Sequence, residues 1–225
     1  NAIKIFNEKE VDELFIIDKN ISINSIEPDY EYIKRLTSEC FMPICYGGGI
    51  SSLEVASKIF DTGLEKILLQ SAAIKDPQII YNLTKVYGSS SITLSVDVRK
   101  NLSGNYKIFS YKESEYINMD LEIYLKKFHE LGVGEILINN IDKDGTLTGP
   151  DFDLIKSLNI INIDVPIIVQ GGISSIEDIK KLFSYNIISG VAIGSFFIYY
   201  GKNRAVLINY LNNNEKKFVY DLANE

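Results

Sequence analysis

An internal repeat is the feature that most restricts the folds open to this chain. The segment PICYGGGISSLEVASKIF (43–60) aligns without gaps with PIIVQGGISSIEDIKKLF (166–183), and ten of the eighteen positions are identical. DELFIID (12–18) and GEILINNID (134–142) are related by the same offset within one residue. Self-similarity at about half the chain length indicates a duplicated unit. The fold must therefore accommodate two similar halves.

Short apolar runs alternate with helical patterns along the whole chain. Near-continuous apolar runs of this length indicate strands buried on both faces, as in a parallel sheet covered by helices. We expect seven strands, at Leu14–Asp18, Pro43–Tyr46, Lys66–Gln70, Ile92–Asp97, Glu135–Asn140, Pro166–Gln170 and Gly190–Gly194. We expect helices at Tyr30–Ser38, Leu53–Thr62, Pro77–Tyr87, Leu121–Leu131, Phe152–Leu158 and Ile176–Phe183, an amphipathic helix in the first eleven residues, and a small hairpin at Asn105–Glu113.

The repeat also decides between the two folds that such an alternation permits. An open doubly wound sheet and a (β/α)8 TIM barrel both consist of parallel strands with right-handed crossovers. Two halves of four βα units each favour the barrel. In that register the strand in SITLSVDVRK (91–100) has no partner in the chain. We therefore predict an α/β fold, a single (β/α)8 TIM-barrel domain over residues 1–225, with a first strand that would precede Asn1.

Composition excludes several function classes. The formal net charge is −7 and Lys and Arg form no cluster, which argues against a nucleic-acid partner. No run of about 18 apolar residues is present, so no membrane partner is expected. Cys40 and Cys45 have neither disulfide nor zinc-site spacing, which indicates a reducing cytoplasm as the location. We expect Cys45 to pack inside its strand.

Glycine-rich loops follow four of the predicted strands. Function in such barrels gathers at the carboxyl ends of the strands, and glycine lets backbone N–H groups approach an anion closely. The loops are Gly47-Gly48-Gly49, Gln70-Ser71-Ala72, Gln170-Gly171-Gly172 and Gly194-Ser195. One Gly-Gly pair could serve only a tight turn. Matched pairs in both halves instead favour two facing phosphate sites, and hence a small-molecule substrate phosphorylated at both ends.

Carboxylates also stand at the carboxyl ends of the strands. Asp97 and Asp18 each end a strand, and the segment IDKDG (141–145) follows another. A carboxylate in this position faces the pocket and can act as a general acid or base. Asp18 could instead cap the following helix or hold a lysine, and IDKDG could be an ordinary turn.

Three charged residues stand at the opposite, amino ends of the strands. They are Glu13, Lys66 and Glu135. Charges that project into the bottom of a barrel are costly unless they are paired. Sequence alone leaves open whether they form a solvated ion pair at the rim or a functional gate.

Taken together, the motifs resemble the HisF family, the cyclase subunits of imidazole glycerol phosphate synthase. The resemblance runs from DELFIID through YGGGI, SAAIKDP, SVDVRK, GEILINNIDKDGT and QGGISS to Gly194-Ser195. It implies that a glutaminase partner, HisH, docks at the amino-terminal face and releases ammonia, which crosses the barrel. Ammonia then cleaves and cyclises a doubly phosphorylated ribulosyl intermediate, giving imidazole glycerol phosphate and aminoimidazole carboxamide ribotide.

The resemblance also implies roles for particular residues and a barrel of the duplicated histidine-biosynthesis type. Asp97 falls on one of two catalytic aspartates, and the other belongs to the first strand. Glu13, Lys66 and Glu135 match an ammonia entrance. Substrate and phosphate contacts are implied at Asp18, Gly49, Gln70, Ser71, Asp144, Gly145, Gly171, Gly172, Gly194 and Ser195. An acid and a base aspartate suffice for the proton transfers, so we expect no metal and no cofactor.

Several departures from the family pattern keep other acceptors open. Gln70 stands where the family usually has Asn, and Asp18 is followed by Lys-Asn-Ile-Ser. The segments ECFMPICYGGGI (39–50) and GSFFIYYGKNRAVLINY (194–210) are more similar to HisF-like paralogues of surface-polysaccharide biosynthesis. Similarity to those paralogues implies that ammonia forms an acetamidino group on a nucleotide-linked sugar. A related phosphate-binding barrel isomerase is a further alternative, although it would not need the three charges of an ammonia entrance.

Overall fold

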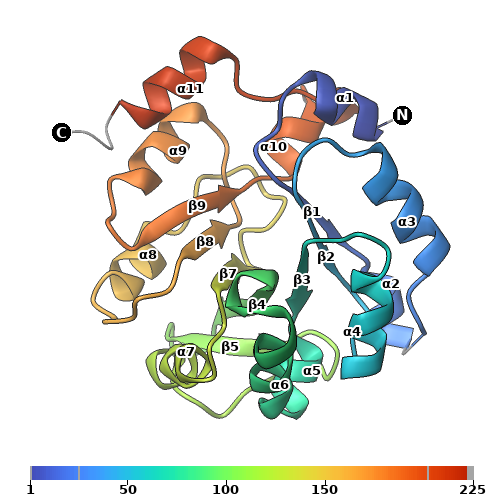
Figure 1. Cartoon of the computed structure of the whole chain (residues 1–225). Coiled ribbons are helices and arrows are strands. Elements are labelled where there is room, and N and C mark those ends of the chain that lie inside the picture. Colours follow the sequence, from blue (N-terminus) through green and yellow to red (C-terminus); the bar gives the residue numbers. More distant parts are fainter. Residues whose placement is uncertain (1, 25, 202, 222–225) are drawn as a thin grey trace.

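The parallel sheet predicted from the apolar runs is present in the structure, a computed structural model that describes residues 2–24, 26–201 and 203–221. The strands follow the order β1-β2-β3-β4-β7-β8-β9, each parallel to its neighbours. They are β1 (Leu14–Ile17), β2 (Ile44–Gly47), β3 (Lys66–Leu69), β4 (Ile92–Lys100), β7 (Glu135–Asn140), β8 (Ile167–Gln170) and β9 (Ile188–Ala192). Figure 1 shows the sheet curling about a central axis inside a ring of helices. The (β/α)8-barrel fold class is confirmed.

Helices connect the strands and cover the outside of the sheet (Figure 1). They are α1 (Ala2–Glu8), α2 (Lys19–Asn24), α3 (Tyr30–Glu39), α4 (Leu53–Phe60), α5 (Ser71–Lys75), α6 (Gln78–Tyr87), α7 (Leu121–Glu130), α8 (Phe152–Leu158), α9 (Ile176–Phe183), α10 (Ser195–Ile198) and α11 (Asn213–Tyr220), with a short 3-10 helix at Ser89–Ser91. Side-chain caps start many of them, for example Asp29 at α3 and Asp120 at α7. No helix in the described part of the chain is long and apolar enough to cross a bilayer.

The long connection after β4 contains more strand than the sequence predicted. β5 (Tyr106–Ser110) pairs antiparallel with the last residues of β4, and β6 (Glu115–Tyr116) pairs with β5. The hairpin predicted at Asn105–Glu113 is thus only partly correct, because that range contains β5 while both strands that pair with β5 lie outside it. A second small sheet, β10 (Tyr199–Tyr200) with β11 (Ala205–Val206), follows α10 and was not predicted.

The internal repeat folds into two equivalent βα units, β2–α4 and β8–α9. Ser52 caps α4 and Ser175 caps α9, each by accepting a hydrogen bond from a backbone N–H of the first turn. The glycines before these caps are required by the backbone. A Cβ on Gly48 would lie 2.5 Å from the carbonyl oxygen of Asp18, and one on Gly171 would lie 2.6 Å from that of Asn140. The repeat thus preserves a close approach of neighbouring loops in both halves.

Apolar side chains form two separate clusters, one outside and one inside the curve of the sheet. The inner cluster consists of Cys45, Leu68, Leu137 and Ile168. Strand β4 divides its residues between the two sides with the period of two expected of a strand. Ile92, Leu94, Val96 and Val98 belong to the outer cluster. Thr93, Ser95 and Asp97 therefore face the inside of the barrel, where all three are buried.

Candidate active site

The carboxyl ends of the central strands bring three polar side chains into one row. Asp97 on β4 pairs in register with Asn139 on β7, which pairs in turn with Gln170 on β8. Residues in register on parallel strands point to the same side of the sheet. The Asn139 side-chain amide donates a hydrogen bond to Asp97 Oδ1 at 2.9 Å. The predicted catalytic aspartate is therefore buried and held by a neighbour on the next strand.

Its surroundings suit Asp97 to proton transfer. Burial raises the pKa of Asp97 above its ordinary value. The nearby amides of Gln70 and Asn139 and the positive charge of Lys19 oppose that rise without cancelling it. A raised pKa makes a carboxylate a stronger base, and a buried carboxyl group at a strand end can accept and return a proton. The site therefore holds a group able to act as general acid or base.

Two buried polar atoms beside Asp97 have no hydrogen-bond partner among the described residues. They are Gln70 Nε2, a donor that lies near Asp97 without a hydrogen bond of standard geometry, and Asn139 Oδ1, an acceptor. Buried polar atoms without a partner are costly and rare in folded proteins. A polar ligand that offers both an acceptor and a donor would satisfy them.

A recess lies at the carboxyl ends of β8 and β9. Its lining contains six of the predicted substrate-binding residues, Asp144, Gly145, Gly171, Gly172, Gly194 and Ser195. We call these six residues the glycine recess. Gly171 and Gly172 have φ angles of 111° and 86°, in the region that favours glycine. The structure thus brings together the residues of one predicted phosphate site.

The residues of the other predicted phosphate site lie at the same edge of the sheet. Gly49 follows β2, and Gln70 and Ser71 follow the adjacent strand β3. Asp18 has the capping role that sequence left open, since the Ile21 N–H donates to Asp18 Oδ1 at 3.2 Å. The two sides of the barrel mouth are joined by Lys19, whose ammonium lies 3.9 Å from Asp144 Oδ2.

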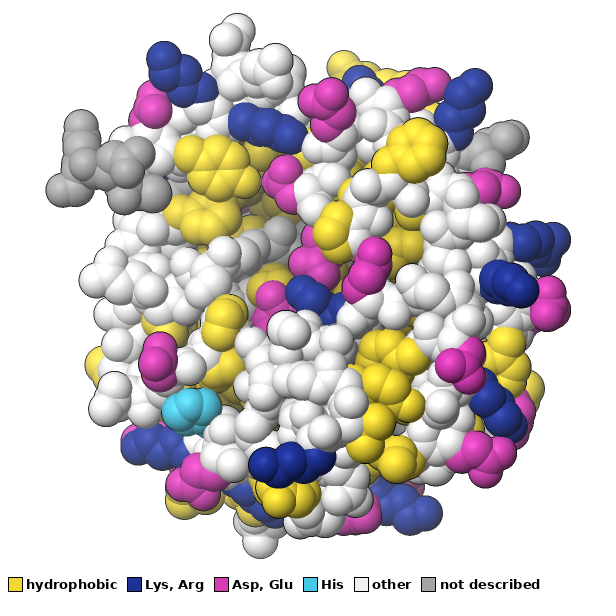
Figure 2. All heavy atoms as spheres, viewed as in Figure 1, with side chains coloured by type: hydrophobic (Ala, Val, Ile, Leu, Met, Phe, Trp, Pro, Cys, Tyr) yellow, Lys and Arg dark blue, Asp and Glu magenta, His cyan; other side chains and the backbone are white. Residues whose placement is uncertain are grey.

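The three charges predicted at the amino ends of the strands form one cluster. Lys66 Nζ lies 2.8 Å from Glu13 Oε1 and 3.2 Å from Glu135 Oε2. The Thr93 hydroxyl donates to the same Glu135 oxygen at 3.1 Å. Figure 2 shows acidic and basic side chains together at the middle of the face that Figure 1 presents, inside the ring of helices. We call Glu13, Lys66 and Glu135 the charge cluster.

Neither cysteine is suited to nucleophilic chemistry. Cys45 is fully buried in β2, as predicted, and burial raises the pKa of its thiol strongly. Cys40 is partly buried, and burial again raises its pKa. The thiolate is the reactive form, so both groups are poor nucleophiles at neutral pH. Within the described ranges, no three or more His, Cys, Asp or Glu side chains are arranged to hold a metal ion.

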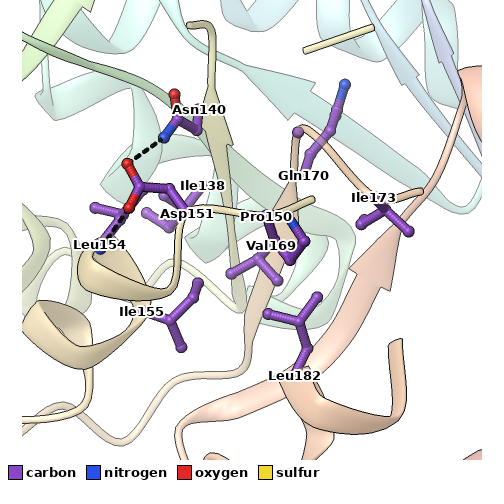
Figure 3. Close-up of a pocket in the computed structure, with 11 residues that line it drawn as sticks. Ile138, Asn140, Pro150, Asp151, Leu154, Ile155, Val169, Gln170, Ile173 and Leu182 are labelled. Atoms are coloured by element: carbon purple, nitrogen blue, oxygen red, sulfur yellow. Dashed lines mark hydrogen bonds between the residues drawn. The ribbon is translucent and has the colours of Figure 1, made fainter. Parts of the chain in front are cut away.

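A second, very small pocket lies between the sheet and helices α8 and α9. Its lining is mostly apolar, and two of its polar residues, Asn140 and Asp151, pair with each other. The Asn140 amide points to Asp151 and donates to it at 3.4 Å, and Asp151 caps α8 (Figure 3). This pocket is a gap in the packing outside the barrel, and we assign it no ligand.

Sequence reasoning missed two residues of the site. Asn139 was read only as part of a strand, although it holds Asp97, and two consecutive asparagines at a strand end were the available signal. Lys19 was noted only as a departure from the family pattern, and its contact with Asp144 spans 125 positions of the sequence. No local pattern could have predicted that contact.

Comparisons with known proteins agree with this geometry. A family model described as "Histidine biosynthesis protein" matches residues 1–204. A Leptospira borgpetersenii protein named "Putative imidazole glycerol phosphate synthase subunit HisF" is 42% identical over 221 residues, which cover 98% of this chain and 87% of that protein. A Pseudomonas aeruginosa protein with the same name but the symbol hisF2 is 45% identical over 210 residues, 93% of this chain and 83% of its own length.

A third relative carries the name without qualification. The "Imidazole glycerol phosphate synthase subunit HisF" of Chloroherpeton thalassium is 30% identical over 194 residues, which cover 86% of this chain and 76% of that protein. The range of the family model, residues 1–204, contains all the parallel strands, the glycine loops and Asp97. The chain belongs to the histidine biosynthesis protein family, and within it to the HisF proteins.

Proposed function

We propose that this chain is the ammonia-using synthase subunit of a glutamine amidotransferase. Its first candidate reaction is the HisF cyclase step, which forms imidazole glycerol phosphate and aminoimidazole carboxamide ribotide. Ammonia would enter through the charge cluster, cross the barrel and react beside Asp97. The observation that carries the proposal is a line of buried polar side chains along the inner side of β4.

That line joins the two ends of the barrel. Thr93 pairs in register with Glu135, and Asp97, four residues further along the strand, pairs with Asn139. At a rise of about 3.3 Å per residue, four residues span about 13 Å. Ser95 lies between them, also buried and also facing inward. The Thr93 hydroxyl already donates to Glu135, and the hydroxyls of Thr93 and Ser95 could both exchange hydrogen bonds with a passing ammonia molecule.

The acceptor end of the proposal rests on the carboxyl edge. The substrate would place one phosphate in the glycine recess and the other near Gly49, Gln70 and Ser71. Its reacting atoms would then lie between the two, beside Asp97. The Asn139 acceptor and the Gln70 amide beside Asp97 would orient its polar groups. Asp97 would exchange protons with the substrate as the imidazole ring closes.

The source of ammonia must be a second protein in this proposal. Both cysteines are buried to some degree and have raised thiol pKa values, which leaves no candidate nucleophile for glutamine hydrolysis among the described residues. A HisH-like glutaminase would dock at the amino-terminal face, around the charge cluster. Both cysteines are free thiols, in keeping with a reducing cytoplasm.

A second candidate acceptor is an acetamido group on a nucleotide-linked sugar, with the same fold and ammonia route. This second acceptor is favoured by the sequence identities to the relatives. The two relatives at 42% and 45% carry the qualified name, and one of them has a numbered symbol. The relative with the unqualified name is only 30% identical. Gln70, at the edge of a predicted phosphate site, also favours the second acceptor, because its side chain is one methylene longer than the Asn that is usual in the family.

The test supplies ammonium salt and the histidine-pathway intermediate to the purified protein and detects imidazole glycerol phosphate by mass spectrometry. We expect turnover that disappears in Asp97→Asn. Asp142→Asn is the matched control, because Asp142 lies near the same edge but pairs with Arg99 at 3.2 Å. Folded protein that binds phosphate without turnover would refute the cyclase reaction. Turnover of a nucleotide-linked acetamido sugar would then establish the second acceptor.

A further inference from the structure

The hairpin of β10 and β11 stands beside the glycine recess. It follows α10 directly, and α10 begins at Ser195, a residue of the recess. Tyr199 pairs with Val206 and Tyr200 with Ala205. The Leu207 N–H donates to the carbonyl oxygen of Ile198 at 2.9 Å, which closes the base of the hairpin. These bonds hold the two strands of the hairpin together next to the glycine recess.

Arg204 ends the turn and reaches the loop after β7. Its guanidinium donates a hydrogen bond to the carbonyl oxygen of Gly145, another residue of the recess. It also lies over the Tyr199 ring, 5.9 Å from the ring centroid. The Arg204 backbone has a φ of 49°, an uncommon conformation for a non-glycine residue. Hairpin, ring and loop together hold this cation at the edge of the recess.

The glycine recess has no cation of its own among its lining residues, so the position of Arg204 matters for anion binding. The residues that line it include one carboxylate, Asp144, and no lysine or arginine. Lys143 has its Cβ near Gly172, but its ammonium donates to Thr148 at 3.3 Å. A phosphate anion would therefore meet one carboxylate, Asp144, which Lys19 partly neutralises from 3.9 Å, and no cation among the lining residues. Arg204 forms no ion pair with any described carboxylate, so most of its five N–H donors are available for an anion.

We infer that Arg204 binds the phosphate group of the substrate in the glycine recess. The ligand class is an organic phosphate, either a phosphate monoester or the diphosphate of a nucleotide. Arginine suits this role because its planar fork can donate two parallel hydrogen bonds to phosphate. This inference rests on the proposed function, since it assumes that the recess receives a phosphate.

The test measures binding of inorganic phosphate and of uridine diphosphate to the purified protein by titration calorimetry at low salt. Arg204→Ala removes the whole group. Arg204→Gln keeps a donor for Gly145 but loses the charge, and Arg204→Lys keeps the charge. Arg35→Ala is the matched control, because Arg35 also lies over a tyrosine ring, at 5.8 Å, but on the helix α3. Thermal unfolding shows whether each variant folds like the wild type.

We expect Arg204→Ala and Arg204→Gln to bind the preferred probe at least about tenfold more weakly, which corresponds to loss of one charged hydrogen bond. Arg204→Lys should retain most of the affinity, and Arg35→Ala all of it. Preference of the wild type for uridine diphosphate would identify a nucleotide as the phosphate source. Equal affinity of the wild type and Arg204→Gln would overturn the inference alone. A wild type that binds neither probe would overturn the phosphate recess and the proposed function with it.

Discussion

Replacing Lys66 with methionine tests whether the charge cluster is both a structural and a functional element. The substitution keeps the length and apolar stem of the side chain and removes the ammonium that contacts Glu13 and Glu135. The side chains of these three residues are 21%, 24% and 17% exposed. Two carboxylates would then remain close together, partly buried and without a cation between them.

The expected loss of stability follows from that partial burial. Exposed ion pairs contribute about 0.2–1 kcal/mol, and breaking a fully buried pair costs about 3–5 kcal/mol. The cluster lies between these limits, so Lys66→Met should lose about 2 kcal/mol near pH 7. For a domain of this size, that corresponds to a fall of about 4–8 °C in the melting temperature.

The pH dependence of this loss has a defined sign. Burial lowers the pKa of Lys66, but the hydrogen bonds and charges of Glu13 and Glu135 outweigh it, so the net pKa is raised. Stability from a raised lysine pKa is fully present below the unfolded value of about 10.4. It is lost as the pH rises through the folded pKa. The difference between wild type and variant should therefore be constant through neutral pH and shrink above about pH 10.

The assays are denaturant unfolding and two measurements of synthase turnover. One is driven by ammonium salt, and the other by glutamine with the proposed glutaminase subunit. We expect Lys66→Met to keep the ammonium-driven rate at its working temperature and to change the glutamine-driven rate. Lys85→Met is the control, since Lys85 is exposed and lies over the Tyr81 ring on the helix α6. If the two variants match in stability and in both rates, the reasoning about the cluster is wrong.

Three further predictions follow from the backbone and from buried groups. Gly171→Ala should lower the unfolding free energy by about 3 kcal/mol, because the new Cβ would lie 2.6 Å from the carbonyl oxygen of Asn140. Gly104→Ala is the control and should lower it by about 1 kcal/mol, since no atom lies within 4 Å of a Cβ there. Asp151→Asn should lose about 1 kcal/mol at pH 7. Burial by itself would raise the pKa of Asp151, but its hydrogen bonds and Lys100 hold that pKa below its usual value. The loss of stability should therefore disappear as the pH falls through the lowered pKa. The Cys45 thiol should resist an aromatic disulfide reagent in the folded protein and react in denaturant, and a fast reaction in the folded state would contradict its burial.

Most of the sheet could be predicted because strands buried on both faces leave an unambiguous apolar run. The bounds Glu135–Asn140, Phe152–Leu158 and Ile176–Phe183 agree with the structure residue for residue. The last strand was placed at Gly190–Gly194 but runs from Ile188 to Ala192. Small residues occur inside this strand as well as after it, so the sequence marks no clear end. An irregularity in its pairing with β8 adds to the ambiguity.

The site was less predictable than the sheet because its contacts join distant loops. The strand-end position of Asp97 identified it as a catalytic candidate, since barrels gather function there. Its hydrogen bond to Asn139 depends on the register of β4 with β7, which no local pattern specifies. The Arg204 contact with Gly145 depends on a two-residue strand pairing, which is too short to leave a period-two pattern.

The two halves of the barrel have kept one backbone and diverged in their side chains, and this divergence limits what the repeat can reveal. Gly48 and Gly171 make the same close approach, to Asp18 in one half and to Asn140 in the other. Asp18 caps a helix, whereas Asn140 donates to Asp151. A symmetric backbone can therefore bind a substrate with two similar ends, while its chemistry depends on residues that only one half carries. The residues that select the acceptor should therefore be those present in only one half, such as Arg204. Substitutions at such positions can change the substrate without disturbing the backbone that the two halves share.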